Sequence, residues 1–588
     1  MRESLVPVQR YARRLLDMDP EEIAARLAER LPAAGPVAAP RWTPPPAAVL
    51  AGRLEQCFLY GPARGRDLVQ FWQLEHPEAA ERLVELARQA LDRWEVFGVP
   101  VRLTPGEIDW HAGDQRWSWE LNRHQFLFLL ARAAVLTGER EFAARALALV
   151  EDWRAHNPYG AGANWSSALE VAVRAISWLW ALPLLWPARE WLDGLYDHYC
   201  YLSTHLSIYT DPTNHLVGEA AALWLLSVAL PDLPGAAGQE RRALAILARE
   251  VARQVTPDGV SREQSTGYQR FVLDFCRQVV TLAKKTGRRI PPLLEQRTAA
   301  MADFLALLGG EDAPAIGDGD GGRGVPFPEP RPEVDWWLPL PQPPPVTGRV
   351  FAAGGYCFWE AGDLALLFDA GPLGLWPNAS HGHADTLSIQ VRVGSRWVLG
   401  DPGTGAYGAN PEVRDALRGT AAHNTVTVDG LDQSEALDLF KWLAPVQARL
   451  VENHSDERTD YALGMHEGYR RLRRPVTHYR SVLFLRPPAP DAGWILTDRL
   501  KGTGRHRCAL RFHFPPGMEL RPNGARAVVA MDPAAGVGLR LAFSEPGWRV
   551  EPGLWSGRFG HWETAPVVVL ERTVELPLVW VTMLTPIR

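Results

Sequence analysis

The chain has 588 residues, a formal net charge of −6, 46% hydrophobic residues and 22% charged residues. This length exceeds what one hydrophobic core usually organises, so we expect a globular protein of about two to four domains. The acidic balance argues against a nucleic-acid partner, which normally requires a basic surface. It does not exclude an anionic sugar polymer, because a local basic cleft can lie on an acidic protein.

The five cysteines are scattered and include no CxxC pair, which indicates neither a disulfide framework nor a thiolate metal site. The N-terminal segment lacks the apolar core and the small-residue cleavage site of a secretory signal. The most apolar stretch, residues 175–188, is too short to span a bilayer and contains prolines. We therefore expect a cytoplasmic protein with no membrane partner; a periplasmic or secreted location would require a different native start.

The first predicted elements, in residues 1–45, are an amphipathic helical segment and a linker rich in Ala and Pro. Residues 46–309 then form the first large domain, where apolar residues recur at i, i+3, i+4 and i+7 and Gly and Pro separate the segments. Many of these predicted helices are apolar over broad faces, as expected when helices pack in two layers. An incomplete (α/α) toroid fits this pattern better than a four-helix bundle does.

The pattern changes after the helical part. Residues 310–350 are dense in Gly, Asp and Pro and are predicted to be a linker. Residues 351–588 alternate apolar and polar positions between turn residues, which predicts an antiparallel β-sandwich. The fold class we expect is therefore α+β and multidomain, with the toroid followed by the sandwich.

The 24 tryptophans are an unusually large number for this length. Most are expected to pack in the core between helices. A few could instead line a sugar cleft, where an indole face packs against a pyranose ring. Composition alone leaves both interpretations open.

A dense group of polar residues lies at the ends of predicted strands in the C-terminal half. His381 and His383 are two residues apart, so on an extended segment both imidazoles face the same side. Asp401 directly follows one predicted strand, and His423 directly precedes another. Two neutral imidazoles and a carboxylate suit Zn²⁺ or a similar divalent ion, with a fourth position open for water. We predict a metal site at His383, Asp401 and His423; alternatively these side chains only cap strands and turns.

Further polar residues gather at helix starts in the helical half, which is typical of the mouth of a helical barrel. Asn214 and His215 precede a strongly apolar helix, where Asn214 also suits an N-cap, and Tyr268 lies near the start of another. A lone tyrosine there is also compatible with simple packing. The residues predicted to line a substrate groove are Glu120, Asn122, His124, Asn164, Trp165, Glu170, Arg174, Glu219, Arg262, Glu263, Gln264 and, from the C-terminal half, Asn424.

These residue types favour one chemistry. Cleaving a uronate by β-elimination requires donors that neutralise its carboxylate, for which an amide and an imidazole are suited. A tyrosine or histidine must then take the weakly acidic C5 proton, and a tyrosine can return a proton to the departing oxygen. A glycoside hydrolase would instead need two carboxylates flanking the bond. Amide, imidazole and phenol groups therefore favour elimination over hydrolysis.

Several motifs, in this order, resemble those of the heparinase II/III-like lyases, which are similar to some alginate lyases. They are NHLVGE, EQSTGYQ, IGDGDGGR, GGYCFWE, SHGHADTLSI, GDPGTGAY and AAHNTVTVDG, within roughly residues 100–450. The resemblance implies an incomplete (α/α) toroid followed by an antiparallel β-sandwich. It also implies a polysaccharide lyase acting on an anionic, uronate-containing polymer.

Carried over residue by residue, the resemblance implies that Asn214 and His215 hold the uronate carboxylate, His215 being also a candidate base. Tyr268 would be the base and acid, and His381 would assist in the same cleft. His383, Asp401 and His423 would bind a divalent metal, typically zinc, in a mainly structural role. Three points stay open: which polymer is cut, whether it is cut internally or at its ends, and whether the protein is a monomer or a homo-oligomer.

Two other functions stay open. A catalytically silent polysaccharide-binding or exopolysaccharide-assembly factor would use an aromatic groove and the basic residues Arg470, Arg471, Arg473 and Arg474. A glycoside hydrolase on a similar helical scaffold would use acids such as Glu120, Glu170 or Glu263. Only the lyase would release products with a conjugated double bond.

Overall fold

The computed structural model describes residues 42–58, 65–186, 188, 190–209, 212–310, 313–325 and 348–588. The chain divides into two compact units, neither of them continuous in sequence. The first consists of the chain up to Glu250 with Phe275–Ile290 and Gly324–Leu338, and the second of Val251–Asp274, Pro291–Arg323 and Pro339–Arg588. The helix predicted at the N-terminus lies outside the described residues. The predicted domain boundaries stay predictions.

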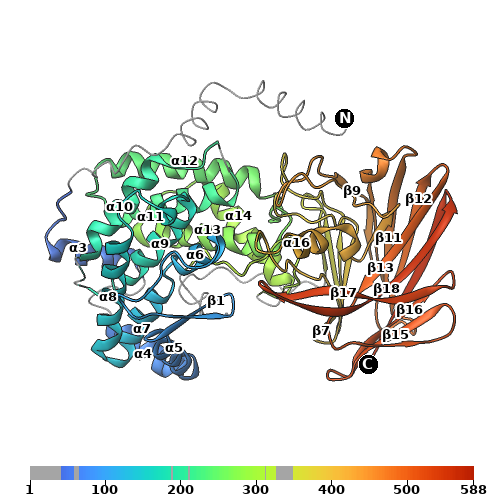
Figure 1. Ribbon diagram of the computed structural model, residues 1–588, viewed down its shortest axis with the longest axis horizontal. Coiled ribbons are helices and arrows are strands. Elements are labelled where there is room, and N and C mark those ends of the chain that lie inside the picture. Colours follow the sequence, from blue (N-terminus) through green and yellow to red (C-terminus); the bar gives the residue numbers. More distant parts are fainter. Residues whose placement is uncertain are drawn as a thin grey trace. The chain divides into compact units, whose positions relative to one another are not determined.

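Helices dominate the chain up to residue 307, and they run from blue to green in Figure 1. They are α3 (Ala47–Cys57), α4 (Gly65–Glu75), α5 (Pro77–Ala90), α6 (Gln115–Leu121), α7 (Phe126–Thr137), α8 (Arg140–His156), η1 (Ala163–Trp165), α9 (Ala168–Ala181), α10 (Glu190–Thr204), α11 (Asn214–Ala229), α12 (Ala236–Gln254), α13 (Thr266–Thr286) and α14 (Pro292–Leu307).

The centre of the helical unit is α9, in which every residue is buried. It packs against α7, α10 and α11, and the last of these is buried along nearly its whole length. A helix that is apolar all round is stable only when other helices cover it. The full burial of α9 and the near-full burial of α11 agree with the predicted packing of helices in two layers.

Most of the largest fully buried side chains are tryptophans. They are Trp72, Trp110, Trp153, Trp178, Trp191, Trp224, Trp359, Trp442, Trp494 and Trp580. For these residues the core interpretation of the high tryptophan content is confirmed.

A short hairpin interrupts the helices and was not predicted. It pairs β1 (Arg93–Val96) with β2 (Val99–Arg102). Phe97 and Gly98 both have positive φ, 49° and 80°, as a two-residue hairpin turn with the twist of its strands requires. The turn has Phe in its first position in place of the usual Asn or Asp, so the sequence lacked the common hairpin signal.

Antiparallel strands dominate the chain from residue 348 onward, and they run from yellow to red in Figure 1. They are β3 (Gly348–Phe351), β4 (Tyr356–Ala361), β5 (Leu364–Asp369), β6 (Ile389–Val393), β7 (Arg396–Leu399), β8 (Val426–Val428), β9 (Ala448–Ser455), β10 (Thr459–His466), β11 (Val476–Leu485), β12 (Gly493–Gly502), β13 (Arg505–His513), β14 (Glu519–Pro522), β15 (Ala527–Asp532), β16 (Val537–Phe543), β17 (Trp548–Arg558), β18 (His561–Glu575) and β19 (Leu578–Ile587).

These strands form three sheets. One has five strands in the order β3-β4-β5-β6-β7, one has four in the order β17-β18-β13-β8, and one has eight in the order β14-β15-β16-β19-β12-β11-β10-β9. The helix α16 (Pro411–Arg418) and the short η3 (Thr420–Ala422) and η4 (Gly468–Arg471) lie among them in sequence. The sequence had predicted strands alone for this half.

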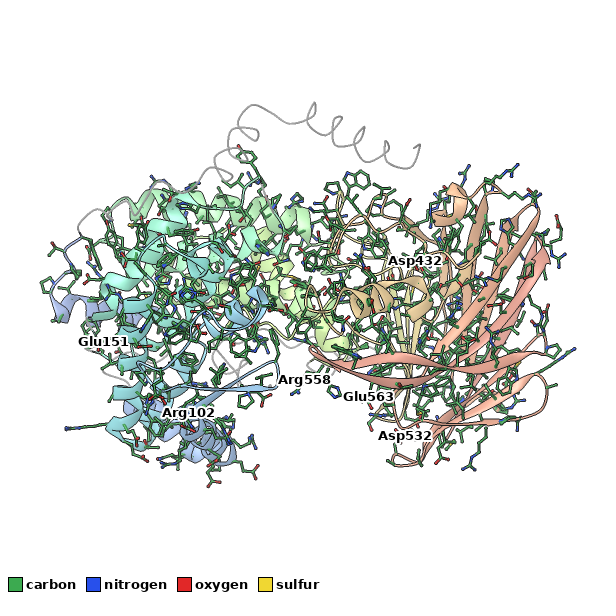
Figure 2. All side chains as sticks on the ribbon, viewed as in Figure 1. Arg102, Glu151, Asp432, Asp532, Arg558 and Glu563 are labelled. Carbon is green, nitrogen blue, oxygen red and sulfur yellow. The ribbon has the colours of Figure 1, made fainter. Side chains whose placement is uncertain are left out.

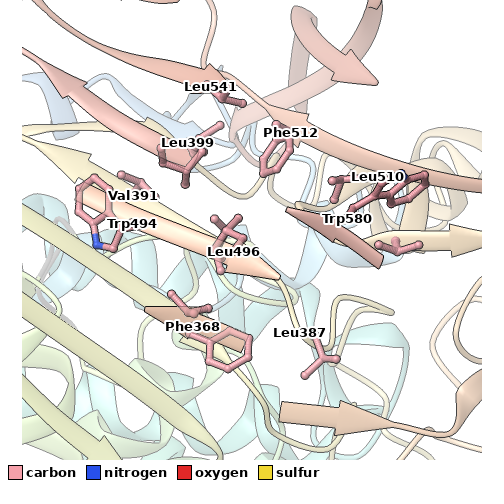
Figure 3. Close-up of a cluster of buried hydrophobic side chains, with 14 of the residues drawn as sticks. Phe368, Leu387, Val391, Leu399, Trp494, Leu496, Leu510, Phe512, Leu541 and Trp580 are labelled. Atoms are coloured by element: carbon pink, nitrogen blue, oxygen red, sulfur yellow. The ribbon is translucent and has the colours of Figure 1, made fainter. Parts of the chain in front are cut away.

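The sheets enclose one large apolar core, part of which Figure 3 shows with Phe368, Val391, Leu496 and Phe512 labelled. In β4 and β5, alternate residues face this core, and the residues between them pack with Phe304 of α14 in a second cluster. This alternation follows from the two-residue period of a strand. Both faces of β5 are therefore buried.

All five cysteines are free in this structure. In the part of the chain that the structure describes, every helix is too short or too polar to cross a membrane.

Candidate active site and metal centre

Tyr268 lies in the first turn of α13, within the second unit. Ser265 precedes this helix, and its Oγ accepts a hydrogen bond from the Tyr268 N–H at 3.0 Å. A serine in this position satisfies an amide that the first turn of a helix leaves without a helical partner. The same hydroxyl donates to the carbonyl of Asp318. The start of α13, and with it Tyr268, is therefore fixed to the segment around Asp318.

The Tyr268 ring is stacked on the imidazole of His381. The two ring centroids are 3.6 Å apart and the planes differ by 17°. The hydroxyl of Tyr268 lies 3.3 Å from that of Tyr407. Burial raises the pKa of Tyr407 well above its usual value, and the charge of Asp318 adds to this effect. Tyr407 is therefore a neutral phenol that can donate a hydrogen bond to the Tyr268 oxygen.

One carboxylate, Asp318, contacts both histidines of the HGH segment. Its Oδ2 lies 3.2 Å from His381 Nδ1 and its Oδ1 lies 2.9 Å from His383 Nε2. Arg414 of α16 binds both oxygens, one of them at 2.9 Å. The side chains of Asp318 and Arg414 are both 0% exposed. Burial acts to raise the pKa of Asp318, but Arg414 and the two imidazoles outweigh it and hold that pKa far below its usual value.

The segment that carries Asp318 is held on three sides. Its Ile316 carbonyl accepts from Thr266 N, its Asp318 N–H donates to the carbonyl of His381, and Gly319 N donates to Thr404 Oγ1. Gly317 has φ +60°, and a Cβ there would lie 2.6 Å from the His381 carbonyl oxygen. A glycine is therefore required at this close approach.

The three predicted metal ligands lie together in the second unit. His383, Asp401 and His423 each offer a ligand atom, and these atoms lie within 4.8 Å of one another. His383 precedes β6, Asp401 follows β7 and His423 precedes β8; β6 pairs with β7, whereas β8 belongs to another sheet, so the tertiary fold brings the three residues together. The predicted proximity of the three residues is confirmed.

The donor set fits a divalent ion such as Zn²⁺. Asp318 accepts from His383 Nε2, and Asp401 accepts from His423 Nδ1 at 2.9 Å. The other ring nitrogens, His383 Nδ1 and His423 Nε2, are buried and have no hydrogen-bond partner. Because a carboxylate only accepts, each ring must carry its proton on the bonded nitrogen and its lone pair on the other. An imidazole oriented by a carboxylate outside the ligand set, as His383 is by Asp318, is typical of a metal ligand, whereas Asp401 is itself one of the three candidate ligands.

The electrostatics of the two imidazoles differ. Burial lowers the pKa of His383, although Asp318 acts in the opposite direction. Burial also opposes protonation of His423, but the charge and hydrogen bond of Asp401 outweigh it and raise that pKa. A metal ion binds only the neutral form, so it competes with the proton at His423 more than at His383.

In the helical unit, Glu120 and Glu170 both bind Arg123. Arg123 donates to the two oxygens of Glu170 at 2.8 and 2.9 Å and to Glu120 at 2.8 Å. Burial acts to raise the pKa of Glu170, but Arg123 outweighs it and the pKa is lowered. Glu170 is therefore an ionised, firmly held carboxylate.

Most of the other predicted groove residues of this unit lie in its interior. Asn122, Asn164 and Arg174 are 1%, 1% and 0% exposed, and Arg174 donates to the carbonyls of Asn122 and Asn164 at 3.4 and 2.9 Å. His124 accepts from Trp178 Nε1 at 2.9 Å, and Trp165 donates to a backbone carbonyl. The structure therefore buries these side chains among the helices, and Trp165 also lines a cavity with Tyr159 and His198; their predicted contacts with substrate stay predictions.

The residues at the start of α11 have distinct surroundings. Asn214 is buried in the first position of the helix, and the N-cap position belongs to Thr213, so the interpretation of Asn214 as the N-cap is wrong. His215 is half-buried. Glu219 accepts from Ser207 N at 2.6 Å and from Ser207 Oγ at 2.7 Å, which ties the preceding loop to the helix.

The remaining predicted groove residues lie in the second unit. Arg262 is exposed, whereas Glu263 and Gln264 are buried, and Gln264 donates to the Gly354 carbonyl at 3.2 Å. Asn424 donates both amide hydrogens to backbone carbonyls at 2.8 and 3.0 Å and accepts from His513 N at 2.6 Å. Its amide therefore joins backbone segments inside the protein, and its predicted contact with substrate stays a prediction.

Sequence reasoning missed Asp318, Tyr407 and Arg414 as members of the cluster. Asp318 lies in the Gly- and Asp-rich stretch predicted to be a linker, and Arg414 lies on α16, where strands were expected. The motifs IGDGDGGR and GDPGTGAY contained two of the three, but nothing in their spacing indicated that they meet His381 and Tyr268. Only the tertiary fold brings these segments together.

The basic stretch Tyr469–Arg480, several of whose arginines the binding-factor alternative used as polymer contacts, is bonded to the loops next to the metal ligands. Tyr469 Oη donates to the Val426 carbonyl at 2.8 Å, and Arg471 donates to the carbonyl of Asp432. Asp432, labelled in Figure 2, accepts from the Thr420 N–H at 2.7 Å, three residues before His423. This stretch is therefore bonded to the turn that leads into the metal site.

Two family profiles match the chain. The profile described as heparinase II/III N-terminus matches residues 77–314, and that described as heparinase II/III-like, C-terminal, matches residues 343–576. Together they cover most of the described helices and strands.

Individual relatives agree with these matches. A heparin-sulfate lyase of Bacteroides stercoris is 22% identical over 70% of this chain and 66% of its own length. A heparin-sulfate lyase of Pedobacter heparinus is 22% identical over 64% of this chain and 59% of its own length, so the matches leave a third or more of each relative uncovered. A solved structure of heparinase III has a TM-score of 0.67 at 16% identity, covering 89% of this chain and 92% of that one. The predicted fold class, an (α/α) toroid with an antiparallel β-sandwich, is confirmed.

Proposed function

This chain belongs to the heparinase II/III-like family, and we propose that it is a polysaccharide lyase that cleaves a uronate-containing polymer by β-elimination. The observation that carries the proposal is the position of the Tyr268 phenol, stacked on His381 and 3.3 Å from the hydroxyl of Tyr407. The relatives named heparin-sulfate lyases support an anionic polysaccharide as the class of substrate.

In the proposed reaction, the oxygen of Tyr268 removes the C5 proton of the uronate. Electrons of the C5–H bond form the C4–C5 double bond as the C4–O bond breaks, and Tyr268 returns the proton to the departing oxygen. Tyr407 donates a hydrogen bond that stabilises the phenolate form of Tyr268, which lowers the cost of deprotonating it. His381 keeps the phenol ring in place through stacking.

In the same proposal, Asn214 and His215 are the residues that bind the uronate carboxylate. Neutralising that carboxylate makes the C5 proton more acidic, because the charge that develops on the acid group is stabilised. An amide and an imidazole supply hydrogen-bond donors for this purpose.

We also propose that His383, Asp401 and His423 hold a divalent metal ion, zinc by preference, in a mainly structural role. The three ligand atoms within 4.8 Å of one another, the unpartnered His383 Nδ1 and the Asp318 carboxylate behind that ring support this proposal. A bound Zn²⁺ would tie together the loops before β6, after β7 and before β8. Its contribution is to stability and to the position of neighbouring residues.

Two observations weigh against the other functions. A hydrolase needs a protonated acid and a second, ionised carboxylate, and the bidentate contact with Arg123 keeps Glu170 ionised, so Glu170 is unsuited to the acid role. In the binding-factor alternative, Arg471 was a polymer contact, yet it donates to the carbonyls of Gln433 and Asp432. No observation in the described residues favours either alternative over the lyase.

The experiment is to incubate the protein with heparan sulfate, heparin, hyaluronan, chondroitin, alginate and uronate-containing bacterial exopolysaccharides. Ultraviolet absorbance of the unsaturated uronate is followed for the wild type and for Tyr268→Phe. We expect absorbance to rise with at least one polymer, and the variant to lose about 10³-fold or more in kcat while keeping its fold, because the proton acceptor is removed. A folded Tyr268→Phe variant with wild-type activity would refute the role of Tyr268.

A further inference from the structure

Asp318 is the only described carboxylate that hydrogen-bonds both His381 and His383. We propose that it is a positioning residue that sets the tautomers of these two histidines together, so that the metal centre and the candidate catalytic histidine depend on one side chain. The proposal rests, for the part that concerns His381, on the proposed lyase function. Its metal part rests on the proposed metal site and is independent of the lyase function.

The direction of each hydrogen bond follows from the chemistry of the acceptor. The two oxygens of an ionised Asp318 only accept, so His381 must hold a proton on Nδ1 and His383 on Nε2. Arg414 Nη1 also lies 3.4 Å from His383 Nε2, but the carboxylate contact is shorter, 2.9 Å, and decides the tautomer. The lone pair of His383 is therefore on Nδ1, the buried nitrogen without a partner.

Several hydrogen bonds, to both the backbone and the side chain, fix the position of Asp318. Its backbone N–H bonds to the His381 carbonyl, its own carbonyl accepts from Ser265, and Arg414 binds both of its oxygens. The segment cannot shift without disturbing the start of α13. A rigid carboxylate fixes the rings that it orients, because a second-sphere hydrogen bond restricts ring rotation as well as tautomer.

Asp318→Asn tests the proposal because the amide has nearly the same shape but a donor in place of one acceptor. Whichever way the amide is turned, one of the two imidazoles then faces an NH₂ group and loses its acceptor. The negative charge that strengthens His383 as a ligand is also lost. We expect metal affinity to fall by about 10–100-fold, the usual effect of removing such a partner.

The matched control is Asp460→Asn. Asp460 is also 0% exposed in the same unit, and it accepts two bonds of 2.7 Å from Arg486. Its substitution removes a buried carboxylate–arginine pair without touching either histidine. A purely structural role of Asp318 would make the two variants alike in metal affinity and in kinetics.

Metal affinity is measured on the full chain by titrating the metal-free protein with Zn²⁺ against a chromophoric chelator, and with Co²⁺ by its visible absorbance. Zinc affinity of Asp318→Asn within threefold of the Asp460→Asn value would overturn the metal part. At saturating Zn²⁺ we expect kcat of Asp318→Asn to stay at least tenfold below that of the control, with KM changed less than threefold. Recovery of kcat to the control value would overturn the link to His381.

The two proposals can fail separately. If the wild type releases no unsaturated product from any polymer, the lyase function fails, but the metal titrations still decide the role of Asp318. If Asp318→Asn does not fold because Arg414 is left unpaired, the double variant Asp318→Asn with Arg414→Gln removes that charge. It is then compared with Arg414→Gln alone, and the same loss of zinc affinity is expected.

Discussion

We predict that the stability of the second unit depends strongly on Arg480 of β11. Its side chain is 0% exposed and binds Asp498 through Nε at 2.8 Å and Nη2 at 3.1 Å. Nη1 donates to the Leu387 carbonyl at 2.6 Å and also to the carbonyl of Asn424. One guanidinium therefore joins a central strand to the loops that carry metal ligands, since Asn424 directly follows His423.

Arg480→Met keeps most of the volume of the side chain but removes every one of these bonds. Removing one partner of a buried ion pair costs about 3–5 kcal/mol, and here it leaves the buried Asp498 with its 2.8 Å contact to His478 Nε2 but no arginine. For a unit of this size, a loss of about 4 kcal/mol corresponds to a fall in melting temperature on the order of 10 °C. The two carbonyl bonds add to this loss.

The assay is thermal unfolding followed by circular dichroism, with Arg549→Met as the control. Arg549 pairs with Glu551 at the surface, with side chains 45% and 39% exposed, and such pairs contribute about 0–1 kcal/mol. We expect the melting temperature of the Arg480 variant to fall several times further than that of the control. Equal shifts would show that the buried network does not carry the stability assigned to it.

Three further predictions concern pH, the second tyrosine and the metal. Burial lowers the pKa values of His124, His198 and His466 in the folded protein. Below about pH 6.5 the unfolded chain therefore binds more protons than the folded one. The free energy of unfolding is highest above that pH, and below it falls by about 1.4 kcal/mol per pH unit for each of these histidines. Melting temperatures that are equal at pH 7 and pH 5 would contradict this. Tyr407→Phe should lower kcat about tenfold with little change in KM, since one hydrogen bond to Tyr268 is worth about 1–1.5 kcal/mol. Steady-state kinetics on the cleaved polymer measures this. An unchanged kcat would mean that the hydrogen bond has no role. Chelation should lower the melting temperature and Zn²⁺ should restore it by binding the folded state alone, and a chelated protein with an unaltered melting temperature would argue against a structural metal.

The metal ligands could be predicted because their residue types and their places next to predicted strands suggested one site. His383 and Asp401 lie near the paired strands β6 and β7, whereas His423 precedes β8 of another sheet, so only the tertiary fold brings it to the other two. Tyr268 could be singled out because its helix start was visible in the apolar pattern. The fold class followed from the same two periodicities.

Asp318 and Arg414 could not be found in this way. Asp318 lies in an irregular segment without any period, and its partners come from three distant parts of the chain. The burial of most predicted groove residues in the helical half could not be foreseen either. Polar residues such as Arg174 and Asn122 suggest a surface, but here they satisfy each other and backbone carbonyls inside the core. Burial with mutual hydrogen bonding cannot be distinguished from exposure by residue type alone.

The central claim is that the polymer is cut by elimination, and isotope incorporation tests it most directly. The polymer that gives the strongest signal is digested in water enriched in heavy oxygen, and the products are weighed by mass spectrometry. Elimination adds no water, so we predict unsaturated ends without the heavy isotope, and products one water lighter than those of hydrolysis. Saturated ends that carry heavy oxygen would show hydrolysis and contradict the role of Tyr268 as the base.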